Sequence, residues 1–546
     1  QMQTLPKSRP SSLDDLVVEV AIIRPGPIQG NAVHPYLRRK QGIEPVEYLH
    51  PSLEPILHDT LGVILYQEQV MRIAISVAGF SPADSDGFRR AMGTWRSSRE
   101  MELLHERFVA GCETTSGMAP DDAEELFRRV AAFASFGFAK SHAAAFARTA
   151  YESAFLKLFY PAQLLVGLIE AQPMGFYPVE VLVNDAKRHG VTVLPVDLNV
   201  STYRTTTEWV GTEGPLPPGA GVAARAEIVR SSGCVVPDEA ARDRWAAPAA
   251  RGWGVRLGLR LVEGIGDELG ARLDAELVRG PYRSLADVVA RTGLPEELIE
   301  RLIRAGALDS LGRPRRELLW ELREVAGASR PVGRRVGRSR TGRVARGTSG
   351  EGAGGGSGED TRGAPAEDTR GAPAEVARQL DLRLPPTPVP VLPPVEEIER
   401  IGDAYAVLSL DATRQVTGLF REALDRIGAV PIAALADRRP GPVVVGGLVV
   451  TRQHPMTARG TVFLALEDET GMANVTLWPD VWARLRGVVR RHALLLVEGT
   501  LQREGNVVNV VATAIRPLPE ATAAAGGPAH PSGVRRMGLE GGRRVR

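Results

Sequence analysis

The residue types best suited to binding an anion lie in the segment SFGFAKSHAAAFARTAYESAFLKLFY, residues 135–160, where a glycine-containing loop leads into a long predicted helix. We expect Ser141 to cap this helix and Pro161 to end it. Lys140 and His142 flank the predicted cap. Free amides and the helix dipole favour negative charge at a helix N-terminus, so a lysine placed there would hold a phosphate well. The alternative is a capped helix with a solvated lysine, because one helix cap is a weak motif.

The same helix carries apolar residues at a spacing of four, namely Phe146, Ala150, Ala154 and Leu158. This spacing places them on one face of the helix and predicts a buried stripe.

Two arginines offer further phosphate contacts near the end of a helix that we expect to start at Ser81. The planar fork of Arg89 and Arg90 suits phosphate oxygens, although arginines there could equally balance the helix dipole. Asp84 and Asp86 resemble a metal-binding pair in sequence. Residues two apart do not share a helix face, so we interpret these carboxylates as capping and dipole charges instead.

Composition sets the outer limits of the interpretation. At 546 residues the chain should hold several domains, and 67 basic against 65 acidic residues give a net charge of only +2. Cys112 and Cys234 are its two cysteines, which excludes a disulfide framework and suits a reducing cytoplasm. No apolar run reaches the roughly 18 residues of a membrane span, so we expect no membrane partner. The chain starts with Gln1 rather than Met, and we expect it to be the C-terminal part of a longer protein.

Two features point to DNA. Arg38, Arg39 and Lys40 form a basic cluster close to an aromatic residue. Over residues 255–320 an apolar stretch, a Gly-Ile-Gly turn and a helix follow one another, which is the helix-hairpin-helix pattern. Gly264 and Gly266 permit a tight turn whose amides face a DNA phosphate, while a plain helical hairpin is the alternative.

A barrel is predicted near the end of the chain. Residues 443–518 contain five strand-like stretches, with a helical interruption at 479–491 between the third and the fourth, which is the OB-fold arrangement. Phe463 and Trp478 are candidates for base stacking and Arg452 for a backbone contact. These aromatic residues could instead belong to the core.

The segment before the barrel has a composition that cannot bury a core. Residues 326–394 are rich in Arg, Gly and Pro, and EDTRGAPA occurs twice in tandem, so we expect a disordered linker. Its arginines could hold nucleic acid or simply be solvated. The amphipathic hexapeptide QLDLRL, with Gln379, Leu382 and Leu384, is a candidate docking peptide, although so short a match can arise by chance.

Four blocks in order carry a family resemblance: IIRPGPIQGNAVHPYLRRKQG, GVILYQEQVMRIA, GFRRAMG and FGFAKSHAAAFA. Together they resemble the fingers region of the bacterial family C DNA polymerases, the polymerase III alpha subunits. The order of helix-hairpin-helix, linker and OB-fold is similar as well. Three features resemble the error-prone branch of this family: the residues of HPYLRRKQG, the sequence Thr94-Trp95-Arg96 and the end of the chain soon after the barrel.

The resemblance implies a multidomain α+β fold with mostly helical fingers, a helix-hairpin-helix domain, a disordered linker and a β-barrel OB-fold. The expected segments are a fingers-like domain (1–200), an irregular β-containing connector (201–254), the helix-hairpin-helix domain (255–325), the linker (326–394), a helical connector (395–440), the OB-fold (441–518) and a flexible tail (519–546).

It also implies a reaction: template-directed nucleotide transfer in damage-induced mutagenesis, translesion synthesis and DNA repair. The family needs two metal ions, expected to be Mg²⁺, held by palm carboxylates that lie before the RPGP block. No such motif occurs here, so we expect neither catalytic nor metal-binding residues in this chain, and no activity from it alone. Arg89, Arg90, Lys140 and His142 would contact the triphosphate or the primer-template.

The implied partners are primer-template DNA and deoxynucleoside triphosphates, with the sliding clamp and accessory translesion proteins as further candidates. QLDLRL resembles a clamp-docking hexapeptide. A competing hypothesis is a non-enzymatic scaffold of helix-hairpin-helix and OB-fold, which explains residues 255–518 well and residues 20–160 poorly. A purely structural helical protein explains neither the basic clusters nor the barrel pattern.

Overall fold

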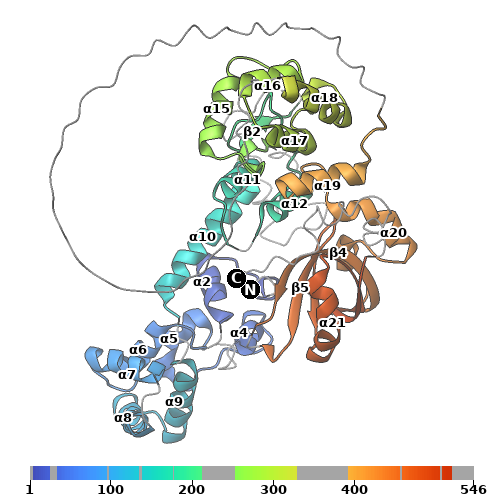
Figure 1. Ribbon diagram of the computed structural model, residues 1–546. Helices are drawn as coiled ribbons and strands as arrows, with labels where there is room; N and C mark the ends of the chain where they lie inside the picture. Colours follow the sequence, from blue (N-terminus) through green and yellow to red (C-terminus); the bar gives the residue numbers. More distant parts are fainter. Residues whose placement is uncertain are drawn as a thin grey trace, which may run out of the picture.

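The computed structural model describes residues 4–24, 33–94, 98–134, 138–175, 177–211, 252–328, 392–455, 458–504 and 507–518. It is a multidomain α+β protein with a helical N-terminal body, a second helical body and a β-barrel (Figure 1). Most of the predicted linker, the hexapeptide within it, much of the predicted connector and the predicted tail lie outside these residues.

The N-terminal body is built from short amphipathic helices. A capping box at Ser12 starts α2, and the Ser81 hydroxyl accepts the Asp84 amide at 3.2 Å, as predicted, at the start of α7. Phe88 and Phe108 stack in its core with ring centroids 5.4 Å apart. The helices are α1 (Leu5–Ser8), α2 (Leu13–Ile22), α4 (Val33–Lys40), α5 (Glu54–Leu57), α6 (Gln67–Ser76), α7 (Pro82–Thr94), α8 (Ser98–Ser116) and α9 (Pro120–Ala134).

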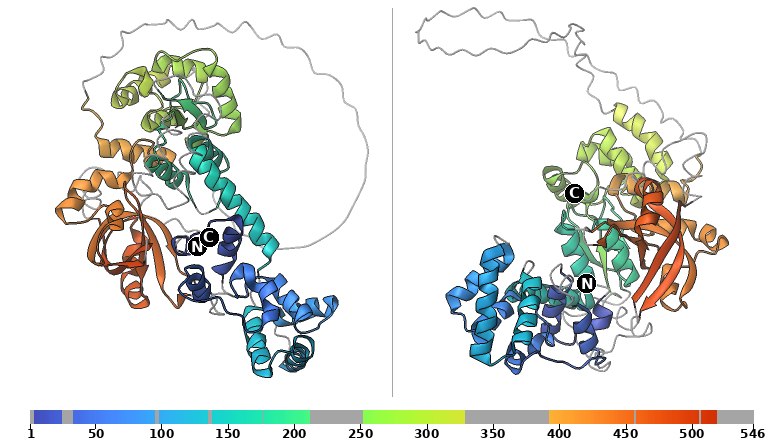
Figure 2. Two further views of the ribbon diagram at one scale, coloured as in Figure 1. Left: turned by 180° about the vertical axis from the view of Figure 1, so that it is seen from behind. Right: turned by 90° about the horizontal axis from the view of Figure 1, so that it is seen from below.

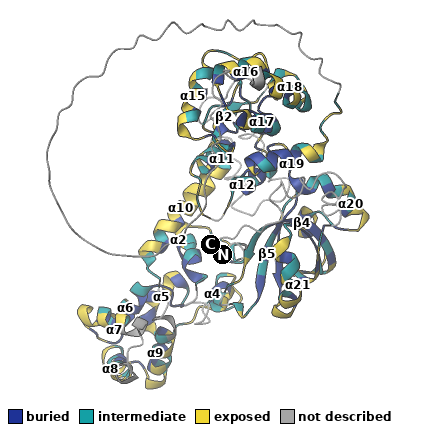
Figure 3. Cartoon of the chain, viewed as in Figure 1, coloured by how far each residue is buried: buried dark blue, intermediate teal, exposed yellow. Residues whose placement is uncertain are grey.

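A single helix, α10 (Lys140–Phe159), leads from this body to the rest of the protein (Figures 1 and 2). Its first half packs on α2 and buries Ala143 and Ala147. The predicted buried stripe is wrong, since Phe146 is 52% exposed and every residue from 148 to 157 is exposed (Figure 3). The apolar spacing was present, but no described element lies there to cover it.

The second body combines helices with a small sheet. Strands β1 (Val193–Leu194), β3 (Trp253–Arg256) and β2 (Thr206–Trp209) lie in the order β1-β3-β2, with β1 parallel to β3 and β2 antiparallel to it. One hydrophobic core joins this sheet to the surrounding helices. These are α11 (Pro161–Glu170), α12 (Val179–Arg188), α15 (Asp267–Leu277), α16 (Leu285–Thr292), α17 (Glu296–Ala305), α18 (Arg315–Ala328) and α19 (Glu397–Leu408).

The predicted OB-fold is confirmed. Five strands close a barrel in the order β4-β5-β6-β8-β7, and α21 (Pro479–Arg491) lies between the third and fourth strands along the chain. The helix α20 (Arg421–Arg426) precedes the barrel. The strands are β4 (Gly441–Gln453), β5 (Val462–Glu467), β6 (Met472–Leu477), β7 (Leu494–Glu504) and β8 (Val507–Pro517). Alternate residues of β5 face the core, because side chains alternate across a strand.

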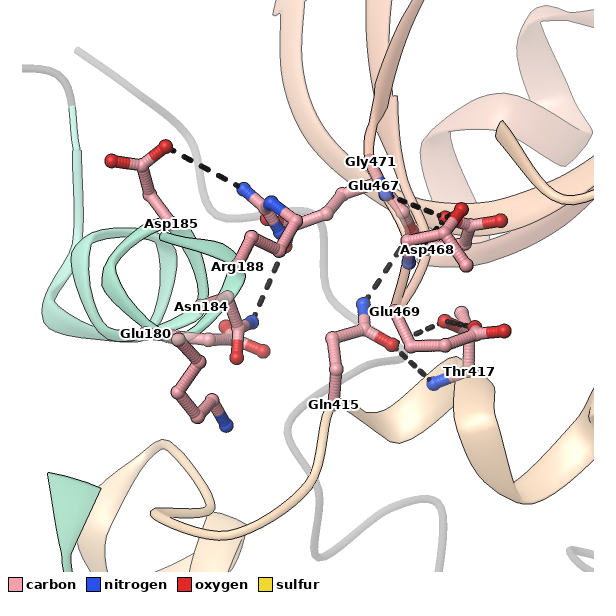
Figure 4. Close-up of polar contacts among 12 residues, drawn as sticks. Glu180, Asn184, Asp185, Arg188, Gln415, Thr417, Glu467, Asp468, Glu469 and Gly471 are labelled. Carbon is pink, nitrogen blue, oxygen red and sulfur yellow. Dashed lines mark hydrogen bonds and ion pairs between the residues drawn. The ribbon is translucent and has the colours of Figure 1, made fainter. Parts of the chain in front are cut away.

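A polar joint holds the barrel against α12 (Figure 4). Glu467 at the end of β5 has no exposed side-chain surface, and it accepts hydrogen bonds from Arg188 Nη1 at 2.6 Å and from Asn184 Nδ2 at 3.3 Å. Nearby, the Tyr405 hydroxyl donates to Glu180 at 2.6 Å. Burial raises the pKa of Glu467, while Arg188 opposes that rise.

Candidate nucleotide and nucleic-acid binding sites

The N-terminus of α10 is an anion site that a carboxylate already occupies. The Lys140 backbone amide donates to both Glu68 oxygens, at 3.0 Å each. The Lys140 ammonium lies 3.0 Å from Asp59 Oδ2 and 5.6 Å from the centre of the Tyr66 ring. The hydrogen bond from Lys140 lowers the pKa of Asp59. The Lys140 amide at this helix end therefore holds a negative charge, whereas phosphate binding there stays a prediction.

The predicted cap of this helix is wrong by two residues. The N-cap is Ala139, which offers no side-chain acceptor, and Ser141 lies within the first turn. Glu68 replaces a cap of the helix's own. His142 lies in an aromatic row, with its ring 5.2 Å from Phe138 and 4.7 Å from Phe146 between centroids.

Arg89 and Arg90 both face Asp86 on their own helix. Arg89 Nη2 lies 2.8 Å from Asp86 Oδ1 and Arg90 Nη2 2.6 Å from Oδ2. The hydrogen bond from Arg89 lowers the pKa of Asp86. Arg90 is the more exposed, with 72% of its side chain accessible. Both guanidinium groups are within reach of a partly exposed carboxylate that a stronger anion could replace.

The arginine pair and the Lys140 site are connected through α6. The Gln67 amide at the start of α6 donates to the Phe138 carbonyl at 3.0 Å, two residues before Lys140. The same helix α6 packs against α7, which carries Arg89 and Arg90. One helix therefore links the two groups of candidate phosphate contacts.

The predicted basic cluster on α4 is largely engaged within the protein. Arg38 forms an ion pair with Glu44 at 2.6 Å, and Arg39 donates to the Leu61 carbonyl at 2.6 Å. Lys40 pairs with Asp15. Burial alone would raise the pKa of Asp15, but hydrogen bonds from Lys40 and Ser11 lower it to about 2. Arg38, with 54% of its side chain accessible, is the most available for DNA.

The predicted hairpin turn at Gly264 and Gly266 is exposed at both glycines, with Ile265 buried between them. Gly264 has φ +100°, a conformation that few other residues adopt. Gly266 is the N-cap of α15. The loop is held from behind by Arg301, whose Nη1 donates to the Glu263 carbonyl at 2.9 Å. Both glycines are exposed, and contact of their amides with a DNA phosphate stays a prediction.

In the barrel, the three predicted contacts differ in their surroundings. Arg452 donates to the Val489 carbonyl at 2.9 Å and to the His492 carbonyl at 3.1 Å, so it holds the last turn of α21. Phe463 is half-buried, and Trp478 is 51% exposed at the N-cap of α21. Trp478 is therefore the most available for stacking.

Sequence reasoning missed several residues at these sites. Asp59 and Glu68 hold Lys140, although they precede it by 81 and 72 residues, so no local pattern could have identified them. The Tyr66 hydroxyl beside them is buried and has no hydrogen-bond partner among the described residues. The arginines of α21 went unnoticed as well, although their density in one helix was a readable signal.

Three family models match the chain. The finger domain of the bacterial DNA polymerase III alpha subunit matches residues 1–116, a helix-hairpin-helix motif matches 190–318 and an OB-fold nucleic acid binding domain matches 443–518. The finger match covers residues 20–116 of the region 20–160 that the scaffold hypothesis explained poorly.

Curated relatives agree with these matches. An error-prone DNA polymerase from Corynebacterium efficiens is 38% identical over 95% of this chain and 40% of its own length. Those from Mycolicibacterium paratuberculosis and Anaeromyxobacter sp. are 39% and 37% identical, over 94% and 95% of this chain. The chain thus spans about two fifths of the length of these relatives. The resemblance to the bacterial family C DNA polymerases, and to their error-prone branch, is confirmed over nearly the whole chain.

Among the described residues, no group of three or more His, Cys, Asp or Glu side chains could hold a metal ion. No helix in the same part of the chain is long and apolar enough to cross a membrane.

Proposed function

We propose that this chain supplies nucleotide and DNA binding to an error-prone, DNA-directed DNA polymerase that acts in translesion synthesis, DNA repair and damage-induced mutagenesis. The observation that carries the nucleotide role is the N-terminus of α10, where the Lys140 amide and ammonium both hold carboxylates. A triphosphate is the stronger anion and would take the place of Glu68 there. Its phosphates would gain the free amides, the helix dipole and the lysine charge together.

Arg89 and Arg90 complete the proposed triphosphate site, with His142 beside it on α10. In phosphoryl transfer the protein contributes mainly positioning and charge stabilisation. Each arginine would exchange the Asp86 carboxylate for phosphate oxygens, which can accept two parallel hydrogen bonds from a guanidinium. Each arginine would thus face a negative group in both states, the Asp86 carboxylate before nucleotide binding and a phosphate after it.

The divalent metal of such a polymerase, which we expect to be Mg²⁺, does not fit the residues described here. Hard cations prefer several carboxylate oxygens at one point. Asp84 pairs with Arg107 at 2.6 Å and Asp86 with two arginines, so neither is free to ligate a metal. We therefore derive no metal-dependent step from this chain.

Primer-template DNA is the proposed macromolecular partner. Gly264 and Gly266 would contact phosphates through their amides, and Arg38 and Trp478 would contribute charge and stacking. Arg39, Lys40, Arg452 and Phe463 stay secondary candidates because they are engaged or partly covered. We also propose two kinds of protein partner. One is the sliding clamp, bound through Gln379, Leu382 and Leu384, and the other is the accessory translesion proteins. The setting of the proposed function would be the cytoplasm.

A direct test uses the purified chain and two measurements. Anisotropy of a fluorescent deoxynucleoside triphosphate and of a labelled primer-template should both report binding. With magnesium and all four nucleotides, the chain should extend no primer, since its described residues lack a carboxylate set. Absence of nucleotide binding, or robust extension by this chain alone, would contradict the proposal.

A further inference from the structure

The outer face of α21 carries a concentration of arginines, of which Arg484 donates a hydrogen bond to the Thr513 carbonyl of β8 at 3.4 Å. This helix contains four arginines and one acidic residue, Asp480. In the described part of the chain, none of the four forms an ion pair with a carboxylate. We call them the α21 arginine face, and all four are exposed: Arg484, Arg486, Arg490 and Arg491.

Two other arginines in or next to the barrel do pair with carboxylates. Arg421, just before the barrel, lies 2.9 Å from Asp468 and 2.5 Å from Glu469. Arg516 on β8 lies 2.9 Å from Glu498. Four exposed positive charges on one helix repel each other, so leaving them all unpaired has a cost in stability. An anionic partner would remove that cost.

The positions of the arginines form two rows along the helix. Arg486 and Arg490 are four residues apart and share one side, while Arg484 and Arg491 are seven apart and share the other. The small residues Ala483 and Gly487 lie between the rows. Val481 and Val489 are buried on the opposite side, against the barrel. Ala483 and Gly487 therefore form a strip of small side chains with a row of arginines on each side.

Aromatic rings lie beside Arg490 and at the start of α21. The Arg490 guanidinium lies 5.5 Å from the centre of the Trp482 ring, and the His454 ring is 6.2 Å from the same tryptophan. At the N-cap of α21, Trp478 is 51% exposed. Positive side chains that follow a backbone, with an aromatic ring on which a base can stack, are the combination that binds single strands.

We propose that the α21 arginine face binds the phosphates of single-stranded DNA, with Trp478 stacking on a base at its end. The inference rests on the proposed DNA-binding function and assigns part of it to a helix rather than to the strands of the barrel. An acidic protein segment could meet the charges of the face, but it would leave the exposed ring of Trp478 without a stacking partner. A nucleic-acid strand supplies both phosphates and flat rings.

The test measures how binding depends on salt. The whole chain is titrated into labelled oligo(dT) of about 16 nucleotides, the upper range for one OB-fold. The variant is Arg486→Ala/Arg490→Ala, because neither side chain donates a hydrogen bond that holds the barrel. Each phosphate contact of a single strand contributes about 0.7 to the slope of log K against log salt, so the slope should fall by about 1.4. Between about 50 and 200 mM salt, the native chain should lose roughly sevenfold more affinity than the variant.

Two matched variants control for charge and position. Arg486→Lys/Arg490→Lys keeps both charges and should keep the native slope. Arg438→Ala/Arg439→Ala removes the same amount of charge just before the first residue of β4. The opposite end of β4 contacts α21 through Arg452, so this control lies at the end of the strand away from that contact. This control should also keep the native slope. Equal thermal melting curves would show that all variants are folded.

The outcomes separate this inference from the function on which it rests. If the native chain binds oligo(dT) and the α21 variant keeps its slope, the inference fails while DNA binding stands. If the salt slope falls equally in the α21 variant and in Arg438→Ala/Arg439→Ala, the effect is one of overall charge, and the inference is also overturned. If a glutamate-rich peptide binds with the same arginine dependence and oligo(dT) does not, the face serves an acidic protein instead. Absence of oligo(dT) binding by the native chain counts against both the inference and the proposed single-strand contact.

Discussion

Arg188 on α12 and Glu467 on β5 form an ion pair across the joint between the second helical body and the barrel. Their Nη1 and Oε1 atoms are 2.6 Å apart, and the glutamate side chain is entirely buried. The two residues are 279 positions apart in sequence. A buried carboxylate needs a partner at close range, so this contact fixes how the barrel lies against α12.

Removal of the arginine should loosen this joint. Arg188→Ala leaves the Glu467 carboxylate buried with one hydrogen bond from Asn184, and removal of one partner of a buried pair costs about 3–5 kcal/mol. Hydrogen exchange of the α12 and β5 amides should therefore accelerate by at least about a hundredfold. Arg148→Ala, which breaks an exposed pair with Glu152, is the control and should leave these amides unchanged. Unaltered exchange in Arg188→Ala would show that packing alone holds the joint.

The same joint should depend on pH through Glu467. Its folded pKa is raised above the ordinary value of 4.5, chiefly by burial. A raised pKa means that the protonated side chain favours the contact between the barrel and α12. The stability that Glu467 contributes to this contact is therefore fully present below pH 4.5 and is lost as pH rises through the folded pKa. Protection of the joint amides, corrected for intrinsic exchange, should thus increase on acidification. Glu467→Gln, which cannot ionise, should lack this dependence, and equal pH profiles for the two proteins would contradict the assignment.

Lys140→Ala should weaken nucleotide binding and leave DNA binding unchanged. Loss of one charge-assisted phosphate contact is worth about 1.5–3 kcal/mol, which is roughly a tenfold to hundredfold loss in affinity. Arg89→Ala should act in the same direction. Lys157→Ala provides the control, since it removes an equal charge from the other end of α10, where Lys157 pairs with Asp185 at 2.7 Å. If Lys140→Ala and Arg89→Ala both bind nucleotide with the native affinity, Lys140 does not contact the nucleotide and only lies near the start of α10.

Glu68→Gln should have the opposite effect on nucleotide binding. The glutamine oxygen can still accept the Lys140 amide, but the negative charge that competes with phosphate is gone. A charge at a helix N-terminus is worth about 0.3–1 kcal/mol, so affinity should rise about two- to fivefold. The same anisotropy titration measures it. A fall in affinity would mean that Glu68 supports the nucleotide site rather than occupying it.

The exposed second half of α10 should tolerate substitution in this chain. Phe155 is 40% exposed, so Phe155→Ser should change the free energy of unfolding of the N-terminal body by less than about 0.5 kcal/mol. Phe108 is fully buried, and Phe108→Ala should cost about 3–5 kcal/mol through the cavity it leaves. Urea denaturation followed by circular dichroism compares the two. A large cost at Phe155 would show that this face is covered in solution.

Local chemistry was readable from the sequence alone. Ser81 and Asp84 begin α7 as predicted, because a hydroxyl three residues before an amide satisfies a bond that the helix cannot make for itself. The five strand-like stretches and the helix over 479–491 between the third and the fourth identified the barrel, because that order is the OB-fold arrangement. The order of the polymerase-like blocks carried the resemblance to the bacterial family C DNA polymerases, with which the finger-domain match and the error-prone polymerase relatives agree.

Tertiary structure decided what surrounds each of these features. The apolar spacing from Phe146 to Leu158 predicts burial, yet burial requires a neighbour, and a spacing rule contains no information about neighbours. Lys140 was identified as a cation at a helix start, but only folding brings Glu68 to its amide across 72 residues. The ion pair of Arg188 and Glu467 likewise depends on two surfaces meeting. Interactions between distant segments depend on how the chain closes upon itself, whereas the cap of α7 and the alternation along a strand are satisfied within a few residues.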